Sequence, residues 1–313
     1  MSPSNAVNRV AIVGAGTIGS SWAALCLARG LDVVATDPAP NAEANLRAYV
    51  AGAWKTLAAI GLSSQASPDR LAFTSNLQQA VQDAGFVQES GPELRDFKVR
   101  LFAEMDEAAP PGTILASSTS WITPDVLQSQ CRRPGRCIVG HPLNPPHVIP
   151  LVEVVGGAQT SPDALEHGMA FYASLGKKPI LLHKALPGHV VNRLQAALYK
   201  EILYLVQQGV LGIADADALI SYGPGLRWGV MGPSLQWHLA GGQGGIHHFM
   251  EQLMDPLCGV MSNLGAPDLT DALRQTVIEG VSEQAGGRSV DELADRENRI
   301  IVDLLALRAR AGA

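Results

Sequence analysis

The chain has 313 residues, 47% hydrophobic and 17% charged, and this length exceeds one typical hydrophobic core, so we expect a globular protein of two domains. A net charge of −6 without any lysine or arginine cluster argues against nucleic acid or an anionic membrane as partner, and no apolar run approaches the roughly 18 residues of a membrane span. Residues 1–8 lack a signal-peptide pattern and the four cysteines lack metal spacing, so we expect reduced thiols in a cytoplasmic protein.

The first predicted element is a strand, followed at once by a glycine-rich turn and a helix. Residues 9–13 form a β-branched run, and Gly14, Gly16 and Gly19 match the pattern G-x-G-x-x-G. In this context Gly14 allows a tight turn, Gly16 lets the backbone approach a pyrophosphate, and Gly19 lets the helix pack on the strand. The phosphates would lie at the helix N-terminus. We therefore expect a dinucleotide to contact Gly14, Gly16, Thr17, Ile18 and Gly19.

The second predicted strand, residues 32–36, ends directly before Asp37. At this place a carboxylate binds the hydroxyl groups of the adenosine ribose. Residues 38–43 contain no lysine or arginine that would neutralise a 2′-phosphate. The sequence therefore predicts NAD rather than NADP as the cofactor, with Asp37 among its ligands.

Strands and helices continue to alternate after Asp37. The patterns predict helices at 41–62 and 93–109, and strands at 71–74, 86–88 and 113–116. Such alternation predicts an α/β fold, a Rossmann-like doubly wound domain whose ligands lie at the carboxyl ends of the strands. Glu89 stands at one such end, where it either binds the nicotinamide ribose or is solvated. Ser117 opens a cluster of hydroxyl groups, residues 117–120, that either contacts the cofactor or caps the next helix.

The stretch from His141 to Val155 combines a histidine, an amide and a carboxylate, with prolines that stiffen the loop between them. Residues 151–155 match a buried strand that carries one acid, Glu153. A lone buried carboxylate is costly, so we expect it to pair with His141. Such a pair fixes the tautomer of the imidazole and makes its other nitrogen a better base. His147 has no comparable partner, and we expect it at the surface or on a pocket wall.

Beyond residue 186 the pattern is helical, and strands are hard to find. The longest helical pattern covers residues 187–208. We therefore expect an NAD-binding domain of residues 1–186 and an all-helical domain of residues 187–313 for substrate binding and dimerisation. An apolar helical stretch of this size suggests burial in a dimer, although interior helices would show the same pattern.

Arg227 lies between a leucine and a tryptophan. An unpaired guanidinium among apolar neighbours needs an anion. This anion is either the carboxylate of a substrate, held bidentately, or a structural acid such as Asp215 or Asp217. The histidines of this half show no metal spacing, and we expect no metal.

Several motifs agree in order and spacing with one family: the glycine turn, residues 87–93, the Ser-Ser-Thr-Ser cluster, His141-Pro-Leu-Asn-Pro-Pro, and Pro-Gly-His-Val-Val-Asn-Arg-Leu at 187–194. They resemble the L-3-hydroxyacyl-CoA dehydrogenase family. The resemblance implies that His141 is the catalytic base and Glu153 its partner, and that Ser120 and Asn192 hold the reacting oxygen. It also implies a homodimer formed largely by the helical domain.

Within this family, the chain is most similar to the branch that acts on free 3-hydroxy acids, which includes lambda-crystallin (L-gulonate 3-dehydrogenase) and L-carnitine dehydrogenase. This similarity is carried by residues 87–93, the Ser-Ser-Thr-Ser form at 117–120, and residues 137–142 and 223–233. Carnitine dehydrogenases have Asp at the place of Asn192, which disfavours carnitine itself. Trp121 stands where relatives carry smaller residues. It either lines the pocket, narrowing it or stacking on the substrate, or packs against the cofactor domain.

Three functions therefore compete. NAD-dependent oxidation of a small free L-3-hydroxy acid is favoured, because a CoA site needs cations and residues 41–70 offer only Arg47, Lys55 and Arg70. The second is an L-3-hydroxyacyl-CoA dehydrogenase, or a reductase of carrier-bound 3-keto chains. The third is a non-catalytic, crystallin-like structural protein. Against the third stand His141, Glu153, Ser120, Asn192 and Asp37, which such a protein would not need.

Overall fold

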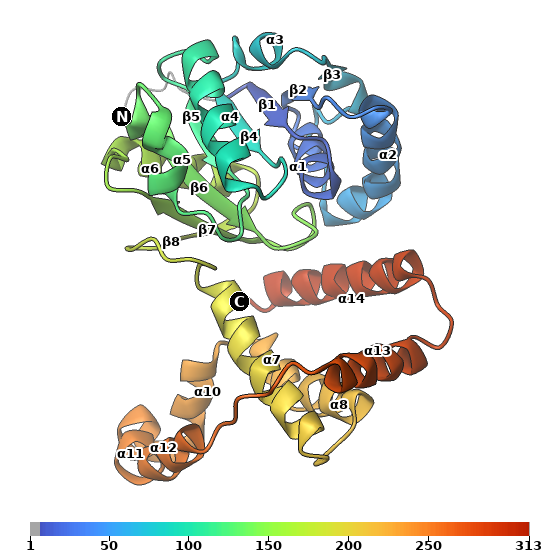
Figure 1. The fold of residues 1–313 in the computed structure, drawn as a ribbon, viewed down its shortest axis with the longest axis vertical. Coiled ribbons are helices and arrows are strands. Elements are labelled where there is room, and N and C mark those ends of the chain that lie inside the picture. Colours follow the sequence, from blue (N-terminus) through green and yellow to red (C-terminus); the bar gives the residue numbers. More distant parts are fainter. Residues whose placement is uncertain (1–6, 313) are drawn as a thin grey trace. The chain divides into compact units, whose positions relative to one another are not determined.

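The computed structural model describes residues 7–312. The chain divides into two compact units, of which one ends at Asn192 and the other begins at Arg193 (Figure 1). The boundary that we predicted, between residues 186 and 187, stays a prediction. In the described part of the chain no helix has the length and apolar character needed to cross a membrane.

An eight-stranded sheet organises the N-terminal unit, in the order β3-β2-β1-β4-β5-β6-β7-β8. Its neighbouring strands are parallel except for β6 and β7, which are antiparallel. The strands are β1 (Arg9–Val13), β2 (Asp32–Thr36), β3 (Leu71–Phe73), β4 (Phe86–Glu89), β5 (Ile114–Ser117), β6 (Cys137–Pro142), β7 (Leu151–Gly156) and β8 (Lys178–Leu181). The first six strands have the order of a dinucleotide-binding sheet, in which the chain changes direction between β1 and β4 and opens a crevice at their carboxyl ends.

Helices cover both faces of this sheet, as β1 illustrates. Val10 and Ile12 share a core with residues of α1, α2 and α6, whereas Ala11 and Val13 share a second core with residues of α3, α4 and α5. Successive side chains of a strand point to opposite faces, so two cores require two helical layers. The helices are α1 (Thr17–Ala28), α2 (Ala42–Ile60), α3 (Leu77–Val81), α4 (Arg95–Ala108), α5 (Pro124–Leu127) and α6 (Pro162–Ser174). The predicted doubly wound α/β fold is confirmed.

The long helix α7 (Val191–Gln207) begins four residues later than the pattern predicted. Gly188 and His189 precede it with φ angles of 79° and 47°, and such left-handed backbone cannot belong to a right-handed helix. The prediction that the helix begins at Pro187 was therefore wrong. As a result Asn192 lies in the first turn of α7.

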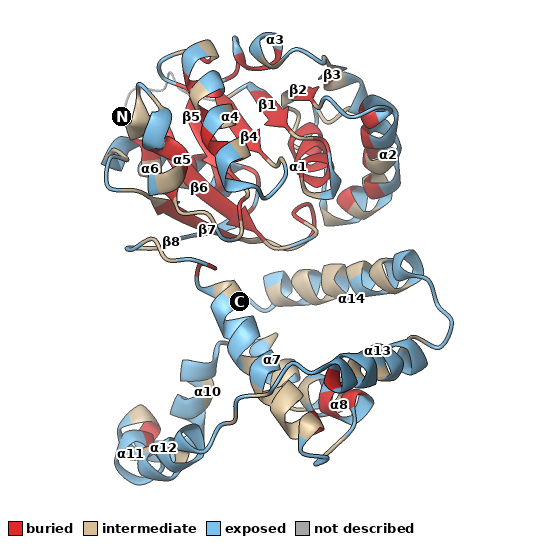
Figure 2. Ribbon diagram, in the orientation of Figure 1, coloured by how far each residue is buried: buried red, intermediate tan, exposed pale blue. Residues whose placement is uncertain are grey.

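The described residues of the C-terminal unit form helices and no strand, as predicted. After α7 these helices are α8 (Ile213–Tyr222), α9 (Pro224–Trp228), α10 (Pro233–Ala240), α11 (Gly245–Gln252), α12 (Met254–Ser262), α13 (Asp271–Ala285) and α14 (Val290–Arg310). Their shared core is small and centres on Val206, Ile213 and Leu273. Figure 2 shows the contrast, with buried residues filling the sheet of the N-terminal unit and exposed residues dominating the helical one.

Candidate active site

The predicted histidine–glutamate pair is present, and it joins two neighbouring strands. His141 of β6 and Glu153 of β7 are register partners in the antiparallel pair. The Nδ1 atom of His141 lies 2.9 Å from Oε2 of Glu153, and both side chains are buried. Directly opposed side chains of antiparallel strands lie on the same face, so the sheet itself holds the two groups together.

Glu153 has a partner for each of its oxygens. Its Oε1 atom accepts hydrogen bonds from the backbone N–H groups of Val190 and Val191, at 2.9 and 3.0 Å. Burial raises the pKa of Glu153, but the bonds from His141, Val191 and Val190 outweigh burial and hold it below its ordinary value. The side chain is therefore a carboxylate, and the start of α7 adds a favourable helix dipole.

Ser120 approaches the other ring nitrogen of His141. Its Oγ atom lies 3.3 Å from Nε2 of His141. A carboxylate only accepts hydrogen bonds, so Nδ1 of His141 donates to Glu153 and Nε2 of the neutral ring is left as an acceptor. The hydroxyl group of Ser120 therefore donates to Nε2. In this tautomer the lone pair of Nε2 points at the hydroxyl group of Ser120.

The glycine turn has the space and the donors that a dinucleotide needs. A Cβ atom on Gly14, whose φ is 94°, would lie 2.7 Å from the backbone of Gly91, and one on Gly19 would lie 1.8 Å from the carbonyl oxygen of Gly14. A Cβ atom on Gly16 would meet nothing within 4 Å, so this position is open to a ligand. The first turn of α1 carries no acidic residue, which leaves its N-terminus free to bind phosphate.

Asp37 follows β2 and is bonded to this turn. Its Oδ2 atom accepts from the N–H of Ala15 and its Oδ1 atom from the N–H of Ala39, both at 2.8 Å. The carboxylate is half-buried, beside the turn that would bind the pyrophosphate. The bonds from Ala15 and Ala39 fix the orientation of this carboxylate. Its contact with a ribose stays a prediction.

Glu89 and Ser117 end the adjacent strands β4 and β5, but both side chains are fully buried. Glu89 Oε1 lies 2.6 Å from both Lys98 Nζ and the N–H of Gly91, and Oε2 accepts from Ser117 Oγ at 2.5 Å. The carboxylate is therefore paired inside the protein instead of being solvated. Direct contact of Glu89 or Ser117 with the cofactor stays a prediction.

The other predicted residues are placed as follows. Trp121 is 59% exposed directly after Ser120. Asn192, at the start of α7, is half-buried. Arg227 is exposed on α9 of the C-terminal unit, and among residues 7–312 it forms no ion pair, neither with Asp215 nor with another acid. Binding roles for these three residues stay predictions.

His147 is buried, with its Nδ1 atom 2.8 Å from Ser21 Oγ. This excludes the surface position, one of the two that we expected, and the place on a pocket wall stays a prediction. Two residues that we did not predict support the site. Glu93 accepts from the N–H groups of Ser120 and Trp121, at 2.9 and 3.0 Å. The second unpredicted residue, His189, packs its ring against His141 with the ring centroids 4.9 Å apart.

Within residues 7–312, no group of three or more His, Cys, Asp or Glu side chains is arranged to hold a metal ion.

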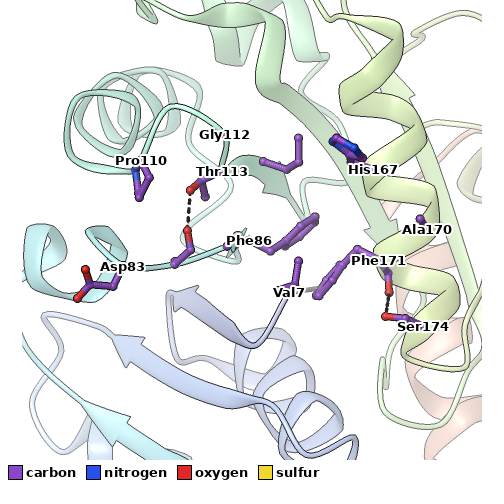
Figure 3. Close-up of a pocket in the computed structure, with 13 residues that line it drawn as sticks. Val7, Asp83, Phe86, Pro110, Gly112, Thr113, His167, Ala170, Phe171 and Ser174 are labelled. Carbon is purple, nitrogen blue, oxygen red and sulfur yellow. Dashed lines mark hydrogen bonds between the residues drawn. The ribbon is translucent and has the colours of Figure 1, made fainter. Parts of the chain in front are cut away.

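A pocket of about 420 Å³ lies outside this site and is lined by Phe86, Ile114 and His167 (Figure 3). Phe86 and Ile114 are the first residues of β4 and β5, so this pocket lies at the edge of the sheet opposite Glu89 and Ser117.

Known proteins share both the sequence and the fold of this chain. The family model of the NAD binding domain of 3-hydroxyacyl-CoA dehydrogenase matches residues 9–185, and that of its C-terminal domain matches residues 188–288. The chain belongs to the 3-hydroxyacyl-CoA dehydrogenase family. It is thus an NAD-dependent dehydrogenase, and the predicted family, cofactor and enzyme class are confirmed.

Relatives in this family are similar over nearly the whole chain. The L-carnitine dehydrogenase of Streptomyces griseus is 48% identical over 97% of this chain and 91% of its own, and that of Streptomyces coelicolor is 47% identical over 99% and 98%. Among solved structures, 5-formyl-3-hydroxy-2-methylpyridine 4-carboxylic acid 5-dehydrogenase, an NAD⁺-dependent dismutase, superposes with a TM-score of 0.84 at 29% identity, covering 97% of this chain and 99% of that one. The 3-hydroxyacyl-CoA dehydrogenase fold thus extends across both units.

Proposed function

We propose that the chain oxidises the 3-hydroxyl group of a small free L-3-hydroxy acid with NAD, and that L-carnitine is the leading candidate for this acid. The observation that carries the proposal is the buried His141–Glu153 pair, in which Nε2 of His141 faces away from Glu153 and lies 3.3 Å from Ser120 Oγ. The candidate substrate rests on relatives that are 48% and 47% identical and are named L-carnitine dehydrogenase.

The pair supplies the proton chemistry. Oxidation of a secondary alcohol removes the O–H proton while a hydride leaves the adjacent carbon. Nε2 of neutral His141 takes that proton, and Glu153 stabilises the imidazolium that forms. In the reverse direction the same ring returns the proton to the oxygen. Ser120 and Asn192 hold this oxygen where charge develops, and loss of one such contact commonly costs about 3 kcal/mol of barrier.

The N-terminal unit would hold the cofactor at the carboxyl ends of β1, β2 and β4. When bound, NAD supplies the ring that accepts the hydride. Its pyrophosphate fits the open N-terminus of α1, and its adenosine ribose fits Asp37. The residues that we assign to the cofactor are Gly14, Gly16, Thr17, Ile18, Gly19, Asp37, Glu89 and Ser117.

The arginine in α2 and the arginine directly before β3 favour a free acid over a CoA ester as the substrate. Arg47 pairs with Glu43 at 2.8 Å, and Arg70 pairs with Asp32 at the same distance. Both guanidinium groups thus have carboxylate partners that compete with the phosphates of CoA. We assign the substrate carboxylate to Arg227, which presents a charged fork on α9.

The quaternary ammonium group of carnitine has a suitable partner in Trp121. Such cations bind the face of an aromatic ring, tryptophan best of all. Trp121 exposes 59% of its surface next to Ser120, and the nearby carboxylate of Glu93 favours a cation further. Against carnitine stands Asn192, because carnitine dehydrogenases have Asp at this place.

A homodimer and a cytoplasmic location belong to the same proposal. The small core of residues 193–312 leaves large apolar side chains exposed, among them Leu194, Val210, Leu219, Tyr222, Leu226 and Val290. Exposed apolar surface on this scale favours burial against a second copy. The cysteines are free, as expected of a protein in a reducing compartment.

The test is NADH formation from NAD⁺ with L-carnitine, L-3-hydroxybutyrate, L-gulonate, 3-hydroxypropionate and L-3-hydroxybutyryl-CoA. We expect turnover of at least one free acid, with the highest kcat/KM for L-carnitine. Turnover of the CoA ester alone would refute the free-acid proposal. Turnover of another free acid, without carnitine, would refute only the assignment to carnitine.

A further inference from the structure

His189 has a backbone conformation that its own side chain does not favour. Its φ angle is 47°, and it is 1% exposed. Left-handed backbone is unfavourable for an L residue, because the Cβ atom comes too close to the following carbonyl oxygen. Such conformations persist where the surrounding structure holds them, and they gather at functional sites. The contacts of His189 therefore indicate the role of this residue in the site.

The first contact joins His189 to the loop of Ser120. Nε2 of His189 lies 3.0 Å from the carbonyl oxygen of Thr119. A carbonyl oxygen only accepts, so Nε2 carries the proton. Thr119 directly precedes Ser120, whose Oγ atom faces His141 at 3.3 Å. The bond thus fixes the turn before α7 to the segment that presents Ser120.

The second contact is with the catalytic histidine. The rings of His189 and His141 have centroids 4.9 Å apart and are tilted by 38°. The charged or titratable groups that face His189 are His141 of β6, Glu153 of β7 and Glu93 after β4. Burial lowers the pKa of His189, and although the bond to Thr119 raises it, the net shift is downward.

A charge on His189 would also lack a hydrogen-bond partner. Its Nδ1 atom is buried and has no partner among the described residues. Protonation would place an N–H donor there without an acceptor, which is costly in a buried site. His189 therefore stays neutral and does not repel the charge on His141 when that ring takes up a proton.

The third link runs through the backbone. The two residues after His189, Val190 and Val191, direct their N–H groups at Glu153 Oε1, which leaves Oε2 for His141. The direction of these N–H groups depends on the turn that His189 fixes. We propose that His189 is a positioning residue, which stays neutral and orients both Ser120 and the carboxylate of Glu153 toward His141. This inference rests on the proposed function, because it gives His189 a role in the same proton transfer.

The test compares two substitutions of His189, and both new residues have to adopt the same left-handed backbone. His189→Phe keeps a ring but removes the donor to Thr119, whereas His189→Gln keeps a donor at similar reach. We expect His189→Phe to lower kcat about tenfold with little change in KM for NAD, and His189→Gln to recover most of the loss. The acidic limb of the kcat–pH profile should move to lower pH in His189→Phe, since a less well directed Glu153 stabilises the imidazolium less.

A substrate-free readout separates this inference from the proposed function. NMR titration of the His141 ring should show a lower midpoint in His189→Phe than in wild type and His189→Gln, whether or not any tested acid is oxidised. An unchanged midpoint in a His189→Phe protein that still binds NADH would overturn the proposal. If His189→Phe does not fold, NMR titration of His189 in the wild-type protein serves as the test. A His189 ring that becomes charged near pH 6.5 would overturn the proposal. A ring that stays neutral with its proton on Nε2 would support it.

Discussion

His141 and Glu153 face each other across the antiparallel strands β6 and β7, with Nδ1 and Oε2 2.9 Å apart. The strand register positions the pair, so no flexible loop has to order before proton transfer. The backbone N–H groups of Val190 and Val191 occupy the second oxygen of Glu153. This leaves the carboxylate with one orientation toward the histidine.

The substitution Glu153→Gln should prevent His141 from acting as a base but should leave NAD binding intact. The amide that it introduces can present an NH₂ group to Nδ1 of His141, which favours the tautomer with its proton on Nε2. That ring cannot accept a proton from the substrate, so kcat should fall by about 10²- to 10⁴-fold, with KM for NAD little changed. Steady-state kinetics check this, and a kcat within about threefold of wild type would show that the carboxylate is dispensable.

Substitution of Asp37 by serine should weaken the preference for NAD over NADP. The carboxylate binds ribose hydroxyl groups and repels a 2′-phosphate, so its loss should raise KM for NAD about tenfold or more and lower KM for NADP. The kcat at saturating NAD should change little, because Asp37 is remote from His141 in the sheet. Unchanged constants for both cofactors would place the ribose elsewhere. Asp83→Ser, at an exposed acid, is the control.

His147 should make the protein less stable in acid. Burial, and then the charge of Lys177, lowers the pKa of His147 to about 4. The unfolded chain, with an ordinary pKa near 6.5, binds more protons between about pH 4 and 6.5. The stability from this group is therefore complete above pH 6.5 and is lost as pH falls to 4, on the order of 3 kcal/mol.

The variant His147→Asn keeps a hydrogen-bond acceptor for Ser21 but has no titratable group at this position. Its free energy of unfolding should depend less on pH than that of wild type between pH 4 and 6.5, as measured by urea denaturation at several pH values. Comparison of the two proteins cancels the other acids that titrate in this range. Parallel curves for the two proteins would refute the buried, neutral state of His147.

Arg227 should bind the carboxylate of the substrate. We expect Arg227→Ala to raise KM for free acids about 10- to 100-fold, because a charge-assisted hydrogen bond is lost. Arg227→Lys should restore only part of the lost affinity for the acid, since an ammonium group cannot form the two parallel hydrogen bonds of a planar guanidinium. Arg299→Ala, at another exposed arginine of this unit, should leave KM unchanged. If Arg227→Ala also leaves KM unchanged, the carboxylate binds elsewhere.

Much of the fold and the core of the site follow from local sequence patterns. The glycine turn and Asp37 are readable because a strand, three glycines and an acid at fixed spacing have few other uses. The pairing of Glu153 with His141 follows from the cost of an unpaired buried acid. The antiparallel direction of β6 and β7 does not follow, since the proline-rich loop between them says little about strand direction.

The side-chain partners of several buried residues could not be predicted, because these residues are far apart in the sequence and meet only in the folded protein. The partner of His147 is Ser21, which lies 126 residues away, so a search for partners close in the sequence did not find it. The pairing of Glu89 with Lys98 joins a strand to a helix. For His189 the signal was weaker still, because its ring meets Thr119, which lies 70 residues away in the sequence.

The most direct test of the central claim is a comparison of kcat and NADH affinity between wild type and His141→Gln, with the best free acid of the panel as substrate. If His141 is the acid/base group, kcat falls by about 10²- to 10⁴-fold while NADH binding, followed by fluorescence, stays within about twofold. A kcat near that of wild type would contradict the claim, because the proton would then be moved by another group.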